Sequence, residues 1–288
     1  MQFHRMFRRF TLALAAAFAL GLAACGGGGG GGGGGLPLLP PVTNEPPPPP
    51  PSSTSRVINA TLKSNANGAT YPIQIYLPAA YEGGSSTYPA MYLTDGDASF
   101  NLGVSRFQNF VDILEQRGKK AIVVGIGGTA RRNTDYLLPG AAAFHDFVTR
   151  ELVPYVESNY RANPARRMLS GLSNGGIFVA SAFFMEGSGQ LTFQYFFSSE
   201  APFNGPVAAQ VEQLEKQMYA DAAARDVPVT LLLAYALSNT GGPTITAMHD
   251  KIASRNYKGL KLSLRAYPGG HTQMDLPSLE DIAARFIE

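Results

Sequence analysis

The sequence predicts an α/β fold in which a mostly parallel sheet carries helices on both faces. Two continuous apolar runs, at 88–96 and 120–128, have the length and composition of strands that are buried on both sides. From there to the C-terminus, helix and strand patterns alternate, which is typical of crossover helices packed on a parallel sheet. A serine between glycines, in 170–176, lies where one strand would pass into a helix.

The elements follow one another in a regular order. Alternating apolar and polar residues at 56–62 and 70–78 predict an antiparallel pair joined by the turn at 63–68. Between the two apolar runs, the stretch 106–116 has apolar residues at helical spacing. Helices and strands then alternate at 141–160, 165–171, 174–184, 192–200, 207–224, 228–236, 244–256, 261–270 and 277–287.

Residues 1–24 have the pattern of an export signal. Three arginines precede an apolar run that is too short and too close to the N-terminus for a spanning helix. The run ends in Leu-Ala-Ala-Cys, and Cys25 is the only cysteine, so no intrachain disulfide can form. This junction is similar to the lipobox of bacterial lipoproteins, in which the cysteine is lipidated. The alternative is an ordinary secretory signal cleaved near Ala24.

A flexible tether is predicted at 25–55. Ten consecutive glycines and a proline-rich run follow the cysteine, and neither composition can bury a core. The resemblance to lipoproteins implies a location in the bacterial cell envelope, with the N-terminal lipid as the sole membrane contact. Gly26 rather than aspartate after the cysteine implies the outer membrane. The remaining 56–288 suit a single large domain.

The charge pattern argues against a nucleic-acid partner. Three of the 23 Lys and Arg lie in the predicted signal, which leaves 20 against 21 Asp and Glu, a net charge of −1. No basic patch is visible in the sequence. The sequence also lacks a metal-ligand cluster, a phosphate loop and a dinucleotide fingerprint. We therefore expect neither a metal nor another cofactor.

Ser173 lies in the pattern Gly-x-Ser-x-Gly, between Gly171 and Gly175. Between a strand and a helix, this pattern is typical of a nucleophile elbow, a sharp turn that projects the serine hydroxyl above the sheet. The N-terminus of the following helix directs free N–H groups and a partial positive charge toward a reacting carbonyl. The backbone N–H of Asn174 is thus a predicted oxyanion donor. The alternative is a plain strand-to-helix turn.

A serine nucleophile needs a base, and three histidines lie beyond the predicted signal. His145 and His249 fall within predicted helices, where we expect structural or solvated roles. His271 follows the last predicted strand and two glycines, which is the place of the base in hydrolases with such an elbow. The alternative for His271 is a surface loop histidine.

From about residue 71 onward, the chain resembles the putative-esterase branch of the α/β-hydrolases. This branch includes esterase D, enterochelin-type siderophore esterases, feruloyl esterases and mycolyltransferases. The resemblance implies the α/β-hydrolase fold and a serine carboxylic-ester hydrolase. The motifs that carry it occur in the family's order: YLTDGD at 92–97, IVVGIGG at 122–128, RNTDY at 132–136, FVTRELVPYVESNYR at 147–161, SGLSNGG at 170–176 and GGH at 269–271.

The resemblance also implies two residue roles. The loop after the strand at 88–96 supplies the second oxyanion donor, which here is the backbone N–H of Asp97, unless that loop is a plain strand-ending turn. The loop at 132–136 lies near the substrate mouth, where Arg132 could bind an anionic substrate. The alternative is that Arg132 and Asp135 brace their own loop.

The third member of the triad does not follow the family's pattern. In the family, the acid usually follows the strand that is here 228–236, but the next residues, LSNTGGP, contain no carboxylate. Glu200 directly follows the apolar run FQYFFSS at 193–199, at the sheet end where the elbow also emerges. Three alternatives remain open: Glu200 is the acid, Asn239 or a backbone carbonyl orients His271, or another acid such as Asp250 reaches it.

These residues predict a serine esterase that cleaves a small-molecule carboxylic ester through an acyl-enzyme. An acyltransferase with the same residues is the nearest alternative. A non-catalytic surface binding protein is a second one, and the missing acid is its only support. The ester itself and the oligomeric state are not predicted, because specificity resides in loops that carry little pattern.

Overall fold

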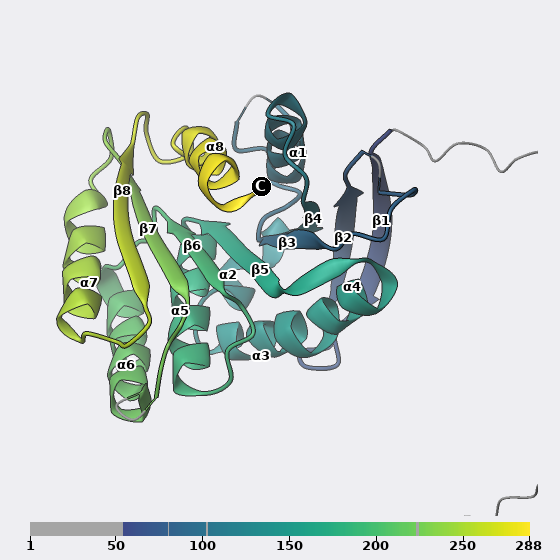
Figure 1. Cartoon of the computed structure of the whole chain (residues 1–288). Coiled ribbons are helices and arrows are strands. Elements are labelled where there is room, and N and C mark those ends of the chain that lie inside the picture. The colour runs from purple at the N-terminus through teal and green to yellow at the C-terminus, as the bar shows by residue number, and fades with distance from the viewer. Residues whose placement is uncertain (1–53, 80, 102, 223–224) are drawn as a thin grey trace, which may run out of the picture. The chain divides into compact units, whose positions relative to one another are not determined.

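The computed structural model describes residues 54–79, 81–101, 103–222 and 225–288, and these form an α/β structure around an eight-stranded sheet (Figure 1). The predicted export signal and Cys25 lie outside the described residues, as does most of the predicted tether. The strands are β1 (Arg56–Lys63), β2 (Thr70–Leu77), β3 (Tyr88–Leu93), β4 (Ile122–Ile126), β5 (Ala162–Leu172), β6 (Tyr195–Ser199), β7 (Thr230–Ala236) and β8 (Lys261–Tyr267).

The sheet has the order β1-β2-β4-β3-β5-β6-β7-β8. The pairs β1–β2 and β2–β4 are antiparallel, and all other neighbouring strands are parallel. Each strand predicted from the sequence is present. The α/β fold with a mostly parallel sheet is therefore confirmed.

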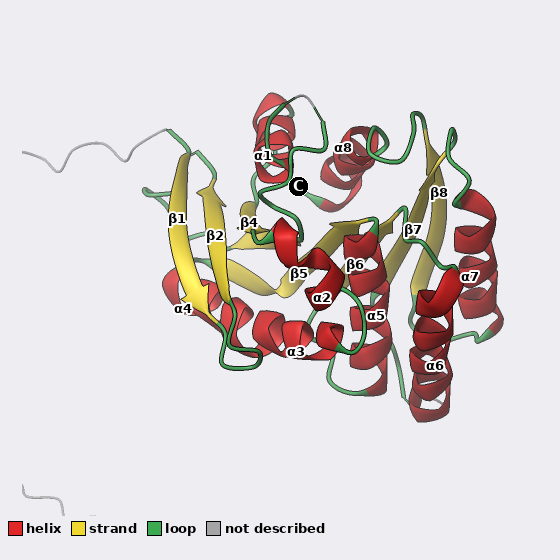
Figure 2. Cartoon of the chain, turned by 180° about the vertical axis from the view of Figure 1, so that it is seen from behind, coloured by secondary structure: helices red, strands yellow, loops and turns green. Residues whose placement is uncertain are grey.

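The helices occupy both faces of this sheet. They are α1 (Arg106–Gln116), α2 (Arg132–Asp135), α3 (Gly140–Phe147), α4 (Val153–Asn159), α5 (Asn174–Ser188), α6 (Gly205–Asp221), α7 (Gly242–Ser254) and α8 (Asp275–Phe286). Helices α1 and α8 cover one face, and α3 to α7 cover the other (Figures 1 and 2). No helix among the described residues is long and apolar enough to cross a membrane.

The helix predicted at 141–160 is interrupted. A π-helical turn at Val148–Leu152 separates α3 from α4. Pro154 explains the interruption, because it lacks the N–H that would bond to the carbonyl of Arg150 in a regular helix. A 3₁₀ turn at Thr129–Arg131 and the short α2 were not predicted.

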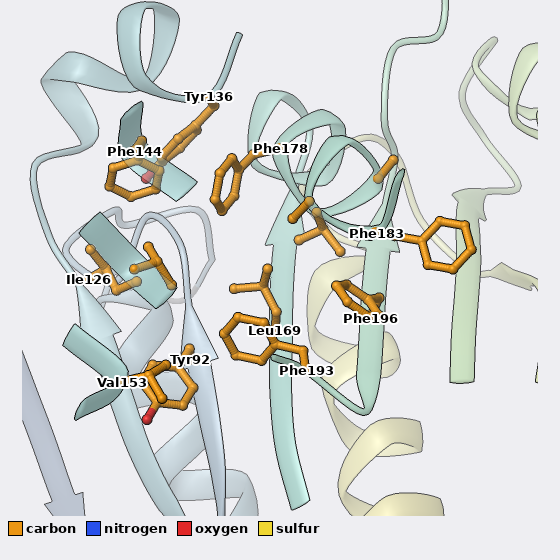
Figure 3. Packing of buried hydrophobic residues seen from close by; sticks show 14 of the residues in the cluster. Tyr92, Ile126, Tyr136, Phe144, Val153, Leu169, Phe178, Phe183, Phe193 and Phe196 are labelled. Atoms are coloured by element: carbon orange, nitrogen blue, oxygen red, sulfur yellow. The ribbon is translucent and has the colours of Figure 1, made fainter. Parts of the chain in front are cut away.

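An aromatic cluster holds α2 beside the nucleophile helix. Tyr136, at the end of α2, lies 5.3 Å from Phe144 of α3 and 5.9 Å from Phe178 of α5, measured between ring centroids. Phe144 and Phe178 are 4.9 Å apart, and all three side chains are buried (Figure 3). This packing fixes α2 close to the start of α5.

A buried ion pair joins α1 to α8 on the other face. Arg106 donates from Nε and Nη2 to the two carboxylate oxygens of Asp275, at 2.9 and 3.1 Å, and both side chains are at least 98% buried. The same guanidinium donates to the carbonyls of Thr94 and Ser170, which lie near the ends of β3 and β5. The pair therefore braces the strand ends that lead to the candidate site.

Candidate active site

Ser173 occupies a strained turn between β5 and α5. Its φ of 63° and ψ of −123° lie in a region that non-glycine residues seldom adopt. Its backbone N–H donates to the carbonyl of Ser199 at 2.9 Å, and its carbonyl accepts from the N–H of Ile177 at 3.0 Å. The sequence therefore forms the sharp strand-to-helix turn that the glycine pattern predicts.

The flanking glycines are required by close backbone approach. A Cβ atom at Gly171 would overlap the carbonyl group of Gly175, and one at Gly175 would overlap the hydroxyl of Thr94. Both overlaps involve atoms inside the packed turn. Larger side chains would force the turn open and displace Ser173.

Glu200 contacts His271 at the same edge of the sheet. Oε2 of Glu200 lies 3.0 Å from Nδ1 of His271, with the Glu200 side chain 1% exposed and the His271 side chain 42% exposed. The backbone N–H of Ala236 donates to Oε1 of Glu200 at 2.5 Å. The carboxylate is thus held by the end of β7, although Glu200 itself follows β6.

Asn239 lies against both residues. Its side-chain Nδ2 donates to Oε2 of Glu200 and lies 3.4 Å from Nδ1 of His271. Nδ1 can donate to the carboxylate or accept from the amide, but not both at once. We assign the proton to Nδ1, because a carboxylate is the stronger partner, and this tautomer leaves Nε2 free to accept a proton.

The other histidines and the third candidate acid lie elsewhere. Nε2 of His145 is 3.0 Å from Oε1 of the buried Glu186. Nδ1 of His249 is 3.0 Å from Oδ1 of Asp250 on α7. Asp250 is thus engaged with its neighbour, and the structure brings Glu200 and Asn239 to His271. The non-catalytic alternative rested on the lack of an acid for His271. The structure places the Glu200 carboxylate beside that histidine.

The two predicted oxyanion donors lie at the ends of adjacent strands. Asn174 is the first residue of α5, so its N–H has no acceptor within the helix. Asp97 follows β3, and within the described part of the chain its backbone N–H has no acceptor either. The Asp97 carboxylate accepts from the N–H groups of Gly128 and Thr129, at 2.8 and 3.2 Å, which fixes its loop.

Arg132 and Asp135 each form an ion pair with a different residue. Asp135 pairs with Arg131 at 2.8 Å. Arg132 instead contacts Asp95 at 3.2 Å. Burial raises the pKa of the Asp95 carboxyl, and the Arg132 guanidinium opposes that rise. Binding of an anionic substrate by Arg132 stays a prediction.

Two residues of the site region were not singled out from the sequence. Asp95 is fully buried with a φ of 53°, and Arg106 is 1% exposed. The sequence Thr-Asp-Gly-Asp after a buried strand predicts a turn at Asp95. It does not predict the ion pair between Asp95 and Arg132. Nothing near Arg106 in the sequence indicates its distant partner.

Part of the chain is similar in sequence to known proteins. The sequence model of a family described as putative esterase matches residues 64–183. The uncharacterized protein YbbA of Bacillus subtilis (strain 168) is 29% identical over 123 residues, which cover 36% of this chain and 46% of YbbA. The chain thus matches less than half of that relative's length.

Two solved structures share the fold over most of the chain. An IroE-like serine hydrolase from Shewanella oneidensis is 24% identical, with a TM-score of 0.66 and coverage of 80% of each chain. The siderophore hydrolase EstA from Aspergillus nidulans is 16% identical, with a TM-score of 0.67 and coverage of 79% of this chain and 93% of its own. Over residues 64–183 the chain is thus similar in sequence to putative esterases, and over most of its length it shares the α/β fold of these two hydrolases.

Proposed function

We propose that the protein hydrolyses carboxylic esters through an acyl-enzyme on Ser173, with His271 as the base and Glu200 as the residue that orients it. The main support is the 3.0 Å contact between Nδ1 of His271 and the buried carboxylate of Glu200. This contact keeps a proton on Nδ1 and stabilises the imidazolium that forms when Nε2 takes a proton.

The first half-reaction acylates the enzyme. Oγ of Ser173 bonds to the ester carbonyl carbon while its proton passes to Nε2 of His271, and the carbonyl electron pair moves onto oxygen. The backbone N–H groups of Asp97 and Asn174 stabilise this oxyanion. When the intermediate collapses, the bond to the alkoxide breaks, and the alkoxide takes the proton from His271.

The second half-reaction repeats these steps with water. His271 removes a proton from water as its oxygen bonds to the acyl carbon. Collapse of the second oxyanion breaks the bond to Oγ of Ser173, which recovers its proton from His271 and releases the acid. An alcohol in place of water would give an acyltransferase with the same residues.

Active-site labelling tests the proposal. A fluorophosphonate probe is expected to label Ser173 in the wild-type protein and not in Ser173→Ala, whose melting temperature should stay within about 2 °C because the backbone is unchanged. His271→Asn should abolish labelling, whereas the control His249→Asn should retain it. Labelling of Ser173→Ala at the wild-type rate would refute the nucleophile.

The substrate is best sought among esters with distinct acid groups. Structural neighbours include a siderophore hydrolase and a ferulic acid esterase, so a panel should include siderophore esters, hydroxycinnamoyl esters and simple acyl chains. Product analysis with and without added alcohols then separates hydrolysis from acyl transfer. Ester formation that exceeds acid release would favour the transferase.

We further propose that lipidation of Cys25 holds the domain at the outer membrane. The Leu-Ala-Ala-Cys junction and the following Gly26 support this location. Cys25→Ser should move the protein from the membrane fraction to the soluble fraction without altering its activity. A variant that still sediments with membranes would contradict the anchor.

A further inference from the structure

The guanidinium of Arg132 bridges the two loops that carry the proposed oxyanion donors. Nε and Nη2 lie 3.2 Å from the two carboxylate oxygens of Asp95, at the end of β3. Nη2 also donates to the carbonyl of Leu172, at 3.2 Å, at the end of β5. Asp95 is two residues before Asp97, and Leu172 is two residues before Asn174.

The Asp95 side of this bridge is rigid. The residue is fully buried, and its backbone N–H donates to the hydroxyl of Tyr136 at 3.0 Å. Tyr136 directly follows α2, the helix that begins at Arg132. The short α2 thus holds the side chain and the main chain of Asp95 from two points.

The Leu172 side fixes the peptide that precedes the nucleophile. The carbonyl of Leu172 and the N–H of Ser173 belong to one planar peptide group. Arg132 holds the carbonyl end, and the carbonyl of Ser199 accepts from the N–H end at 2.9 Å. The carbonyl of Ser173 accepts from the N–H of Ile177 at 3.0 Å, so the next peptide plane, which carries the N–H of Asn174, is held as well.

We infer that Arg132 is a positioning residue, which sets the spacing between the N–H groups of Asp97 and Asn174 through Asp95 and Leu172. This inference rests on the proposed function. It differs from the prediction that Arg132 binds an anionic substrate, because Nε and Nη2 are both committed within the protein. The Arg132 side chain is 24% exposed, and its guanidinium carbon lies 5.8 Å from the ring centroid of Phe100.

The conservative variant Arg132→Lys separates these roles. Lysine keeps the charge, but it is a point donor and cannot span Asp95 and Leu172 together. We expect kcat for a neutral ester to fall about 10- to 100-fold, as for small displacements of catalytic groups, with KM changed less than about threefold. Rates should be divided by the concentration of sites titrated with fluorophosphonate, so that only folded protein counts.

Arg131→Lys is the matched control. Arg131 precedes Arg132 and also makes a two-pronged contact with a buried aspartate, Asp135, but it does not touch either donor loop. Its kcat should stay within about twofold of wild type. A loss in Arg131→Lys equal to that in Arg132→Lys would overturn the inference, since general loosening of α2 would then explain both.

Two substrate pairs give readouts that a structural role would not change. An ester and its thionoester differ in the atom that enters the oxyanion hole, so Arg132→Lys should reduce the wild-type preference for the oxygen ester. A carboxylate-bearing ester and a neutral ester of equal size test substrate binding. A KM increase confined to the anionic ester, with kcat unchanged, would overturn the positioning role.

A double variant tests the inference if Arg132→Lys fails to fold. If Arg132→Lys does not fold, the double variant Arg132→Gln with Asp95→Asn leaves no unpaired buried charge and should show the same loss of kcat. An unchanged kcat in either folded variant overturns the inference. Absence of labelling and hydrolysis in the wild-type protein would instead refute the proposed function.

Discussion

The side chain of Asn239 donates to Oε2 of Glu200, the oxygen that also faces His271. The other oxygen of Glu200 accepts from the backbone N–H of Ala236. Both carboxylate oxygens are therefore held by β7 and the loop that follows it. In the esterases that this chain resembles, the acid usually follows the strand that is here β7. In this chain Ala236 and Asn239 at that position donate hydrogen bonds, and the carboxylate comes from the end of β6.

Glu200→Gln should lower kcat by about 10³–10⁴-fold with little effect on the melting temperature. The amide oxygen can accept from Ala236, which turns the NH₂ group toward His271 and favours the tautomer with its proton on Nε2. That tautomer cannot accept the serine proton. Steady-state ester hydrolysis and a thermal melt would measure the two effects.

Asn239→Ala is the companion variant. It removes one donor to Glu200 but keeps the carboxylate, so a loss of about 3- to 10-fold is expected. The reverse ranking, with Glu200→Gln costing less than about tenfold and Asn239→Ala costing more, would transfer the orienting role to Asn239.

Gly171→Ala should destabilise the turn and remove most activity. Its Cβ would overlap the carbonyl group of Gly175, and relief of such overpacking typically costs about 1–3 kcal/mol together with a backbone shift. Gly189→Ala, at the C-terminal end of α5, is the control, because the nearest neighbour of a Cβ there is 3.5 Å away. Equal activity of both variants would show that the turn can relax without cost.

Asp275→Asn should lower the free energy of unfolding by about 3–5 kcal/mol, because it leaves the buried Arg106 charge without its partner. Glu280→Gln offers a matched comparison. Glu280 pairs with Arg117 between the same two helices, but both side chains are more than 40% exposed, so a loss of at most about 1 kcal/mol is expected. Urea titrations would test this ranking, and similar midpoints would contradict it.

Stability should fall as pH rises from about 10 to 12, partly because of Tyr71. Burial raises the pKa of Tyr71 to about 12 from its ordinary value of 10.0. Over that interval the unfolded chain loses this proton before the folded chain does, so the unfolded state is favoured. Tyr71→Phe should flatten the slope of unfolding free energy against pH, and an unchanged slope would contradict the assignment.

The fold and much of the site could be predicted because their signals are local. Strand length, apolar continuity and helical spacing are read over a few residues, and Ser173 is marked by its neighbouring glycines. Glu200 could be predicted as a site residue for a similar reason, because the carboxyl ends of parallel strands lie at one edge of the sheet. Its position after a strand placed it near the elbow without any knowledge of packing.

Pairings between distant side chains could not be predicted in this way. Arg106 and Asp275 are 169 positions apart, and neither has a neighbour that signals burial. Arg131 and Arg132 lie four and three residues from Asp135, the two spacings at which helical side chains meet. The sequence pattern alone does not show which of the two arginines pairs with Asp135. The orientation of α2 against the sheet determines that it is Arg131.

The proposed catalytic residues emerge one after another during synthesis, with the base last. Ser173 lies inside the family match at 64–183, whereas Glu200 and His271 come later. A nascent chain therefore presents its hydroxyl well before the proposed base emerges, and the partner of Arg106 emerges later still. On the proposed function, a fragment cut before the last loop would lack both the proton acceptor and the Asp275 partner of Arg106, and we expect it to show no esterase activity.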